Sequence, residues 1–206
     1  MVSGKFITLE GIEGSGKTSN LECISNILKE HSIEFIVTKE PGGGPIGKDL
    51  RSILLNKNAL ISSETELLLM LADRKDHLDN LIIPNLQKGV WVLSDRYLDS
   101  TYAYQGGGRE IERSLIDNLM DFLDIPKPDL TLLFDLSPEI ALKRAIERSS
   151  LDRFESESID FHSRIRETYL EIANSESGRF KIIDSSVGFE AVRKQVSSII
   201  FDFINV

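Results

Sequence analysis

Apolar residues along this chain alternate between short β-type runs and longer segments with helical spacing. The β-type runs are Phe6–Leu9, Glu34–Thr38, Val90–Leu93, Leu130–Phe134 and Phe180–Ile183. Every residue in the run at 90–93 is apolar, which is typical of a parallel strand covered on both faces. Strands separated by helices predict an α/β fold with a doubly wound, five-stranded parallel sheet.

Segments with apolar residues three, four and seven positions apart lie between these runs and predict helices. They cover Asn20–Lys29, Asp49–Leu55, Glu110–Leu123, Glu139–Arg148 and about Ile159–Asn174. The residues that a C-terminal helix is expected to bury are Phe189, Val192, Val196, Ile199, Ile200 and Phe203. A polar segment at 99–109, after the third strand, carries three consecutive glycines.

One further predicted helix is unusual because residues 67–71 leave it no polar face. The segment Ser62-Ser63-Glu64-Thr65-Glu66 offers an N-cap with acidic residues in the first turn. The helix is expected to run to about Ile83 and to stop before Pro84. A helix without a polar face is buried all round, which in a chain of this size points to a subunit interface.

Composition narrows the class of protein. At 206 residues, a single domain is expected over 1–206. The net charge of −9 argues against nucleic-acid binding, which requires a basic face. Cys23 is the only cysteine, so neither an intrachain disulfide nor a cysteine-rich zinc site is expected. With no visible signal segment and no apolar run of about 18 residues, we expect a cytoplasmic protein without membrane contact.

The first strand leads into a phosphate-binding motif. Gly11, Gly16, Lys17 and Thr18 match the P-loop pattern G-x-x-x-x-G-K-[ST], and a helical pattern opens at the lysine. The glycines let backbone N–H groups surround phosphate oxygens, and the helix N-terminus adds partial positive charge. The lysine would reach the β- and γ-phosphates, and the threonine hydroxyl would help to hold Mg²⁺. The motif predicts binding of a nucleoside triphosphate.

Glu13 is unexpected in this loop because its carboxylate should repel a phosphate. Two explanations are open. The side chain points to solvent, or it serves a second ligand, for which a hydroxyl group would be suitable.

More polar residues follow the other strands, at the carboxyl edge where ligands bind in such sheets. Asp95 and Arg96 follow the third strand. The aspartate is positioned like one that organises Mg²⁺, although it would also serve as a cap, and a bidentate guanidinium suits a phosphate. Lys39 and Glu40 follow the second strand.

Basic residues also gather after the fourth strand, at Lys143, Arg144, Arg148 and Arg153. The charged, loop-like segment at 149–158 is where a lid over a triphosphate would lie, although a solvated helix face is an alternative for Lys143. Arg51 and Arg74 lie elsewhere, so basic groups outnumber those that one nucleotide needs. The residues predict a small-molecule kinase that transfers a phosphoryl group between two phosphorylated ligands.

Several motifs together resemble the thymidylate kinase family, whose members phosphorylate dTMP with ATP. The motifs are Gly11-Ile12-Glu13, Glu40-Pro41-Gly42-Gly43 with Arg51 downstream, Asp95-Arg96-Tyr97, Ala103-Tyr104-Gln105-Gly106 and Leu151-Asp152-Arg153. The resemblance extends from Phe6 to the C-terminal helix. It implies a P-loop nucleoside monophosphate kinase fold, a lid at about 144–158, Mg²⁺ with ATP as phosphoryl donor, and a homodimer. Because Gly14 leaves the P-loop without a basic residue at that position, the chain is similar to the bacterial arrangement, with basic residues in the lid.

The resemblance also implies four sets of site residues. Those for ATP are Gly11, Ile12, Glu13, Gly14, Ser15, Gly16, Lys17, Thr18 and Arg144. Those for dTMP are Glu13, Glu40, Pro41, Arg51, Met70, Arg74, Arg96, Thr101, Tyr104 and Gln105. Those for catalysis are Lys17, Asp95, Arg96, Arg148 and Arg153, and those for the metal are Thr18 and Asp95.

In the dTMP set, the resemblance implies that Glu13 holds the 3′-hydroxyl and that Arg51 and Arg96 bind the phosphate. Arg74 would hydrogen-bond the thymine edge, with Thr101 and Gln105 near the other polar atoms of the base. Tyr104 would crowd the 2′ position and disfavour ribose.

Three positions depart from the family pattern. Lys39 precedes Glu40 where the family usually has arginine, and Asp73 replaces an alanine before Arg74. Met70 stands where an aromatic residue normally stacks on thymine. It is either one more core residue or, four residues before Arg74 and therefore on the same helix face, a sulfur contact for the base.

Two other functions stay open. One is a kinase for another nucleoside monophosphate or for a nucleoside, because fold alone does not determine the acceptor. The other is a P-loop switch protein. A GTPase of that kind should carry an Asn-Lys-x-Asp motif, and Asn56-Lys57-Asn58-Ala59 is not one.

Overall fold

The computed structural model describes residues 4–148 and 151–205, and five strands within them form one parallel sheet. The strands are β1 (Phe6–Glu10), β2 (Phe35–Lys39), β3 (Trp91–Asp95), β4 (Leu130–Asp135) and β5 (Phe180–Asp184). Their order is β2-β3-β1-β4-β5, and every neighbouring pair is parallel. The predicted sheet is confirmed, and β1 with its P-loop lies at its centre.

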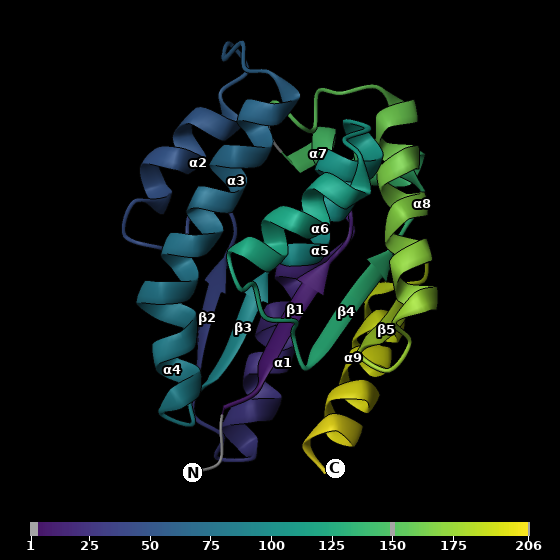
Figure 1. The fold of residues 1–206 in the computed structure, drawn as a ribbon. Helices are drawn as coiled ribbons and strands as arrows, with labels where there is room; N and C mark the ends of the chain where they lie inside the picture. Colours follow the sequence, from purple (N-terminus) through teal and green to yellow (C-terminus); the bar gives the residue numbers. More distant parts are fainter. Residues whose placement is uncertain (1–3, 149–150, 206) are drawn as a thin grey trace.

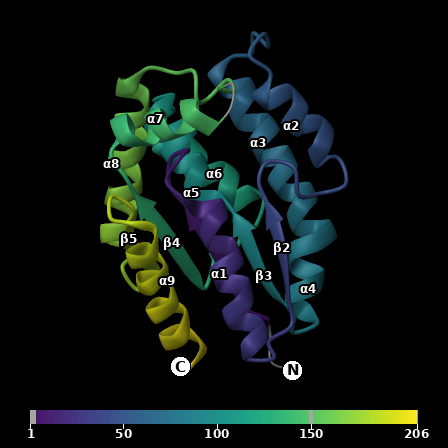
Figure 2. The ribbon, with the colours of Figure 1, turned by 180° about the vertical axis from the view of Figure 1, so that it is seen from behind.

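Helices cover both faces of the sheet (Figure 1). On one face lie α1 (Lys17–Glu30) and α9 (Phe189–Ile204), which are nearest the viewer in Figure 2. On the other lie α3 (Ser63–His77), α6 (Arg113–Phe122) and α8 (Ile159–Ser175). The shorter elements are α2 (Gly47–Leu55), η1 (Leu78–Ile82), α4 (Ile83–Gln87), α5 (Leu98–Thr101), η2 (Tyr102–Gly108) and α7 (Pro138–Arg148).

The two faces have separate cores. Ile24 and Leu28 of α1 and Val196 and Ile200 of α9 are fully buried against one face. The single tryptophan, Trp91, lies at the rim of this core, and its ring meets that of Phe203 edge-on at 5.7 Å between centroids. Two further clusters fill the opposite face beneath α3, α6 and α8. No helix of the described residues is long and apolar enough to cross a membrane.

The predicted end of a helix before Pro84 is wrong. The helical path continues from α3 through the π-helix η1 into α4, where Pro84 occupies the first turn. Proline is tolerated there because its missing N–H belongs to the part of a helix that lacks intrahelical acceptors. The π-helix η1 before it has i→i+5 hydrogen bonds, so the i→i+4 pattern of an α-helix starts again at α4.

The glycine-rich segment at 99–109 is mostly helical, as α5 and η2. A Cβ on Gly107 would lie 2.1 Å from the Thr168 hydroxyl, and one on Gly108 would lie 2.5 Å from the Phe161 ring. The glycines therefore allow η2, which carries Tyr104 and Gln105 of the site described below, to lie directly against α8.

One expectation about burial is wrong within the described chain, and a second, which depends on a subunit interface, is not tested by a single chain. Phe189, the first residue of α9, is 53% exposed because it borders a cavity beside the P-loop instead of the core. In α3, Leu67 and Leu71 are buried, whereas Leu68 is 57% exposed. The apolar segment at 67–71 thus keeps an uncovered face in a single chain.

Candidate active site

The P-loop is held between β4 and α7. Gly11 and Gly14 have φ values of 133° and 76°, which residues with a Cβ rarely adopt. A Cβ would lie 2.5 Å from the Phe134 carbonyl oxygen at Gly11 and 2.4 Å from the Ala141 carbonyl oxygen at Gly14. The strand, loop and helix that the motif requires are present, and glycine is needed for the close approach.

Lys17 folds back over this loop. Its Nζ donates to the carbonyl oxygens of Gly11 at 2.7 Å and Ile12 at 3.0 Å. Burial and the charge of Arg96 lower the pKa of Lys17 to about 8, although Asp95 and other nearby carboxylates act in the opposite direction. An arriving phosphate would supply the negative charge that favours the ammonium form.

Thr18 and Asp95, the predicted metal pair, come from different elements and meet at the mouth of the loop. The Thr18 hydroxyl donates to Asp95 Oδ2 at 3.4 Å. Asp95 Oδ1 is buried and has no hydrogen-bond partner in the described structure. Within the described residues no group of three or more histidine, cysteine or acidic side chains is placed so that it could hold a metal ion. One carboxylate and one hydroxyl suit Mg²⁺ that arrives with a nucleotide, because phosphates and water complete its coordination.

Arg96 is aimed by a left-handed backbone. Its φ of 71° is unusual for a residue other than glycine and costs about 1 kcal/mol. Two hydrogen bonds hold this conformation: the Arg96 N–H donates to the Leu9 carbonyl at 2.9 Å, and the Ser94 hydroxyl donates to the Arg96 carbonyl at 2.7 Å. The strand end thus fixes the direction of the side chain.

The Arg96 guanidinium lies at the centre of a polar cluster. It donates to Glu13 Oε1, to the Tyr104 hydroxyl at 2.9 Å, and to Ser100 and Tyr169 at 3.2 and 3.3 Å. The Tyr104 hydroxyl in turn donates to Glu13 Oε2 at 2.6 Å. Glu13 therefore does not point to solvent, because Arg96 and Tyr104 engage both oxygens of its carboxylate.

The charge state of Glu13 follows from these contacts. Burial alone would raise its pKa, but the charges of Arg96 and Lys17 and the Tyr104 hydroxyl outweigh burial and lower it to about 2. Glu13 is therefore a carboxylate at every physiological pH, and it can only accept hydrogen bonds.

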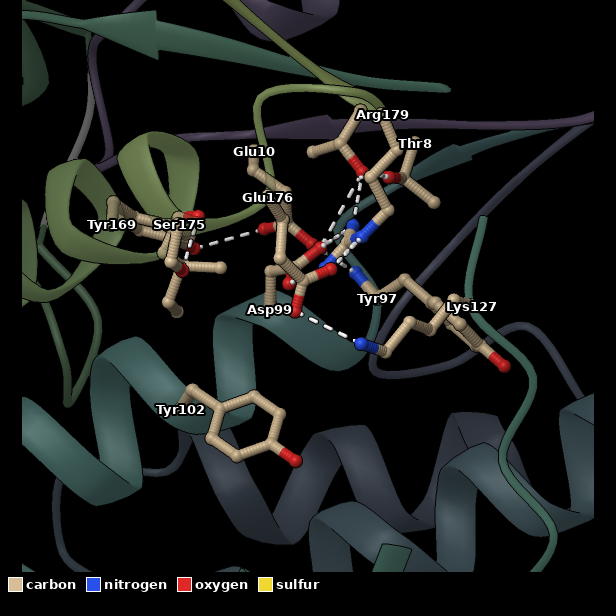
Figure 3. Close-up of polar contacts among 12 residues, drawn as sticks. Thr8, Glu10, Tyr97, Asp99, Tyr102, Lys127, Tyr169, Ser175, Glu176 and Arg179 are labelled. Carbon is tan, nitrogen blue, oxygen red and sulfur yellow. Dashed lines mark hydrogen bonds and ion pairs between the residues drawn. The ribbon is translucent and has the colours of Figure 1, made fainter. Parts of the chain in front are cut away.

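A buried polar layer supports this cluster (Figure 3). Glu10 accepts from the hydroxyls of Ser100 at 2.6 Å and Tyr169 at 2.9 Å, and these same hydroxyls contact Arg96. Burial and the charge of Asp99 raise the pKa of Glu10 to about 7. Asp99 itself is paired with Arg179 through two hydrogen bonds of 2.7 and 2.8 Å. The layer ties α5 and α8 to the sheet below the site.

All ten residues predicted for dTMP line one pocket of about 70 Å³. Its lining is Glu13, Glu40, Pro41, Arg51, Met70, Arg74, Arg96, Thr101, Tyr104 and Gln105, with Leu55, Ser100, Asp152 and Phe154 in addition. The sequence did not assign these last four to a ligand, although Asp152 belongs to the Leu151-Asp152-Arg153 motif. Leu55 and Phe154 are ordinary apolar residues without a motif, and only the fold brings them to the pocket.

Arg74 is a buried group of this acceptor pocket that the protein holds by three hydrogen bonds. It is 2% exposed and donates to Glu40 at 2.8 Å, to the Thr101 hydroxyl at 2.7 Å and to the Tyr97 carbonyl at 2.8 Å. The other oxygen of Glu40 contacts His77 Nδ1 at 2.9 Å. His77, which sequence reasoning left without a role, thus helps to position the buried ion pair.

A second and larger cavity, of about 500 Å³, opens over the P-loop. It is lined by Glu13, Gly14, Gly16, Lys17, Thr18, Ser19, Lys39, Glu40, Arg51, Asp95, Arg96, Arg144, Asp152 and Glu155. Five residues are common to this donor cleft and the acceptor pocket: Glu13, Glu40, Arg51, Arg96 and Asp152. Two ligands would therefore meet at Glu13, Arg51 and Arg96. Of the predicted ATP residues, Gly11, Ile12 and Ser15 do not line this cleft.

Of the arginines predicted for the lid, Arg144 and Arg153 differ in whether they reach a ligand cavity. Arg144 lines the donor cleft, and the side chain of Arg148 lies outside the described residues. Arg153 lines neither cavity. Its guanidinium donates to the Leu54 carbonyl at 2.7 Å and to Glu66 at 2.6 Å, so the structure does not bring it to the phosphate site.

Comparison with known proteins agrees with this geometry. The family profile described as thymidylate kinase matches residues 9–196. The chain belongs to the thymidylate kinase family. The thymidylate kinase of Carboxydothermus hydrogenoformans is 48% identical over 88% of this chain and 89% of its own. Those of Oleidesulfovibrio alaskensis and Hahella chejuensis are 47% and 44% identical, over 98% and 96% of this chain and 99% and 96% of theirs.

One of the departures from the thymidylate kinase pattern has a structural explanation. Asp73 is buried, and both its oxygens accept from the Gly42 N–H, at 3.0 and 3.1 Å. It therefore anchors the glycine turn that carries Glu40 and Pro41. Lys39 lines the donor cleft, and Met70 lines the acceptor pocket while packing partly against the core.

Proposed function

We propose that this protein transfers the γ-phosphoryl group of ATP to dTMP, giving dTDP and ADP as a step in dTTP synthesis. The observation that carries the proposal is the junction of a P-loop cleft with a small polar pocket across Glu13, Arg51 and Arg96. Phosphoryl transfer requires chiefly that donor and acceptor are positioned in line and that charge is stabilised between them. A shared wall with two guanidinium groups meets both requirements.

On the donor side, the P-loop N–H groups hold the phosphates, and Lys17 leaves its two carbonyl partners to reach the β- and γ-phosphates. Thr18 and Asp95 would hold Mg²⁺, which neutralises phosphate charge when bound. Arg144 adds charge from the lid side. The nucleoside part of ATP fits the cavity of about 270 Å³ beside Arg144 and Phe189, where the Ser185 hydroxyl is buried without a partner in the described structure.

On the acceptor side, Arg51 and Arg96 bind the dTMP phosphate at the junction. The sugar lies against Glu13 and Tyr104, so that the carboxylate accepts from the 3′-hydroxyl and the phenol ring crowds the 2′ position. The base lies toward Arg74, Thr101, Gln105 and Met70. These assignments are supported by the pocket that contains all of these side chains.

The lid contributes differently from what the motif alone implied. Arg153 is engaged with Glu66 and the Leu54 carbonyl, and we assign it to anchoring the lid over the acceptor pocket. The catalytic charge from the lid then falls to Arg144 and to Arg148.

A homodimer is proposed on the apolar surface that α3 and α6 leave uncovered. Leu68 is 57% exposed and Phe122 is 82% exposed, and both border a groove that also includes Leu71, Leu119 and Leu123. A second copy of this surface would cover them. Sedimentation of the parent and of Phe122→Glu tests this, since the variant is expected to sediment as a monomer.

We also propose a cytoplasmic location and no nucleic-acid partner. The net charge of −9 disfavours binding to a polyanion surface.

The direct test is release of ADP measured with dTMP, dUMP, CMP and thymidine as acceptors at saturating MgATP. We expect the highest kcat/KM with dTMP. A preference for CMP would indicate a different nucleoside monophosphate kinase. A preference for thymidine would indicate a nucleoside kinase, and the two anion-binding arginines would then need another explanation.

A further inference from the structure

Glu66 is a buried carboxylate whose role so far is to hold the lid residue Arg153. It lies in the first turn of α3, is 1% exposed and does not line either cavity. Its oxygens accept from Gln105 Nε2 at 2.8 Å, from Arg109 Nε at 3.1 and 3.2 Å, and from Arg153 Nη1 at 2.6 Å. The three donors come from η2, from the residue that follows η2, and from the lid. Burying a carboxylate is costly, and these hydrogen bonds and ion pairs offset the cost.

The contact with Gln105 determines which end of its amide faces the pocket. A carboxylate between two guanidinium groups only accepts hydrogen bonds, so the Gln105 atom facing it must be the NH₂ nitrogen. The amide is planar with its oxygen on the other side, and Gln105 lines the acceptor pocket. No donor in the described part of the chain hydrogen-bonds to that oxygen. Gln105 therefore presents its amide oxygen, a hydrogen-bond acceptor, to the pocket.

We propose that Glu66 is a positioning residue that fixes the Gln105 amide, and that this selects a pyrimidine with an N–H at ring position 3. The inference rests on the proposed function, since it places the base of dTMP in the acceptor pocket. Thymine and uracil carry N3–H and would satisfy the Gln105 oxygen. Cytosine carries an unprotonated N3. That nitrogen and the Gln105 oxygen are both hydrogen-bond acceptors, so no hydrogen bond could form between them.

Arg74 reinforces the same choice. Three of its five N–H groups donate within the protein, which leaves two N–H groups and no acceptor for a ligand. These suit the O4 carbonyl of thymine and repel the 4-amino group of cytosine. A site built to satisfy specific hydrogen bonds rejects a ligand that leaves them unmade, because buried polar groups then lose their partners. Arg74 offers only hydrogen-bond donors, and the pair Glu66 and Gln105 supplies the acceptor.

The experiment compares kcat/KM for dTMP and dCMP in the parent and in Glu66→Gln. A glutamine at 66 can present its own NH₂ to the Gln105 oxygen, so the Gln105 amide is free to turn over. We expect the dTMP-to-dCMP ratio to fall by about tenfold or more, partly through a gain on dCMP. A merely structural role would lower both values alike and leave the ratio unchanged.

The matched control is Glu157→Gln. Glu157 also pairs with Arg109, at 2.6 Å, but it makes no hydrogen bond to Gln105 in the described part of the chain. The control removes the same charge from the same arginine, and its ratio should stay within about twofold of the parent. A fall in the control equal to that in Glu66→Gln would overturn the proposal.

Glu66→Asp guards against a variant that fails to fold, because it keeps the negative charge that Arg109 and Arg153 need. Its shorter side chain withdraws from Gln105, so a smaller fall in the ratio is expected.

The parent alone also provides a test. It should favour dTMP over dCMP by about a hundredfold or more, and parity would overturn the inference.

The outcomes separate this inference from the proposed function. If the parent phosphorylates neither dTMP nor dUMP, the proposed function fails. If it phosphorylates dTMP but a folded Glu66 variant keeps the parent ratio, only the role of Glu66 fails.

Discussion

The donor cleft and the acceptor pocket share a wall but are organised in opposite ways. In the donor cleft, of about 500 Å³, polar groups are incompletely satisfied: Asp95 Oδ1 has no partner in the described structure, and Lys17 is bonded only to loop carbonyls. In the acceptor pocket, of about 70 Å³, Arg74 and Arg96 are already held by several protein hydrogen bonds each. The donor side depends on its ligand to complete it, whereas the acceptor side is preorganised.

Changes on the donor side should therefore affect turnover, and changes on the acceptor side should affect stability and selectivity. The largest effect is expected for Lys17→Ala. We expect kcat to fall by about a thousandfold, since this lysine stabilises charge on the transferred group, while circular dichroism and the melting temperature stay near the parent values. Single-turnover kinetics measure the change. A kcat within about tenfold of the parent would contradict the assignment.

Arg74→Met is the counterpart on the acceptor side. It leaves Glu40 buried without its guanidinium partner, and we expect the free energy of unfolding to fall by about 3–5 kcal/mol. Arg51→Met is the control, because Arg51 is half-buried and, among the described residues, donates only to the Pro41 carbonyl. Its stability loss should be below about 1.5 kcal/mol. Urea denaturation of both variants decides the point, and equal losses would mean that the acceptor side is not preorganised.

Glu13→Gln tests the wall between the two sites. A carboxylate that accepts the 3′-hydroxyl makes a charge-assisted bond worth about 1.5–3 kcal/mol, so the preference for dTMP over its 3′-deoxy analogue should fall by about ten- to a hundredfold. Tyr104→Phe, which keeps Glu13 and its charge, should retain most of that preference. An unchanged preference in Glu13→Gln would place the 3′-hydroxyl elsewhere.

The pH dependence of ATP use should report on Lys17. Its pKa in the free protein is lowered to about 8, so below pH 8 the ammonium form is present and above it the proton is lost. We expect kcat/KM for ATP to fall about tenfold per pH unit above pH 8. Under saturating MgATP, kcat should fall at higher pH, because bound phosphate favours the charged form. A flat kcat/KM profile to pH 10 would contradict the role of Lys17.

The smallest effect is expected at Met70. If its sulfur lies against the base, Met70→Ala raises KM for dTMP severalfold with little change in melting temperature, and Met70→Phe restores binding. Leu71→Ala serves as the core control, because Leu71 is 3% exposed and lines neither ligand cavity. It should lose about 2–5 kcal/mol of stability with an unchanged KM. A Met70→Ala variant that behaves like Leu71→Ala would make Met70 a core residue.

The difference between the two regions also explains what could be predicted from sequence. The P-loop and the strands are local signals, set by glycine spacing and unbroken apolar runs, and both predictions are confirmed. The break at Pro84 is wrong because the π-turn before it accommodates the proline, which no local pattern indicated.

Buried polar residues on the acceptor side were harder to predict. Glu66 meets Gln105 from 39 positions away, and Glu40 meets His77 from 37 positions away. Nothing in the neighbourhood of either glutamate shows that it will be buried, because an exposed helix or turn would contain the same residues. Arg153 illustrates the converse, since a motif assigned it to phosphate and its long-range partners hold it elsewhere.

The position of Trp91 has a practical consequence for spectroscopy. The chain has one tryptophan, and its indole contacts Phe203 of α9 at the start of β3, away from the carboxyl edge where both ligands bind. Intrinsic fluorescence should therefore follow the detachment of α9 from the sheet and remain almost silent when nucleotides bind. Unfolding experiments have a built-in optical reporter, whereas ligand titrations will need an introduced chromophore near the cavities.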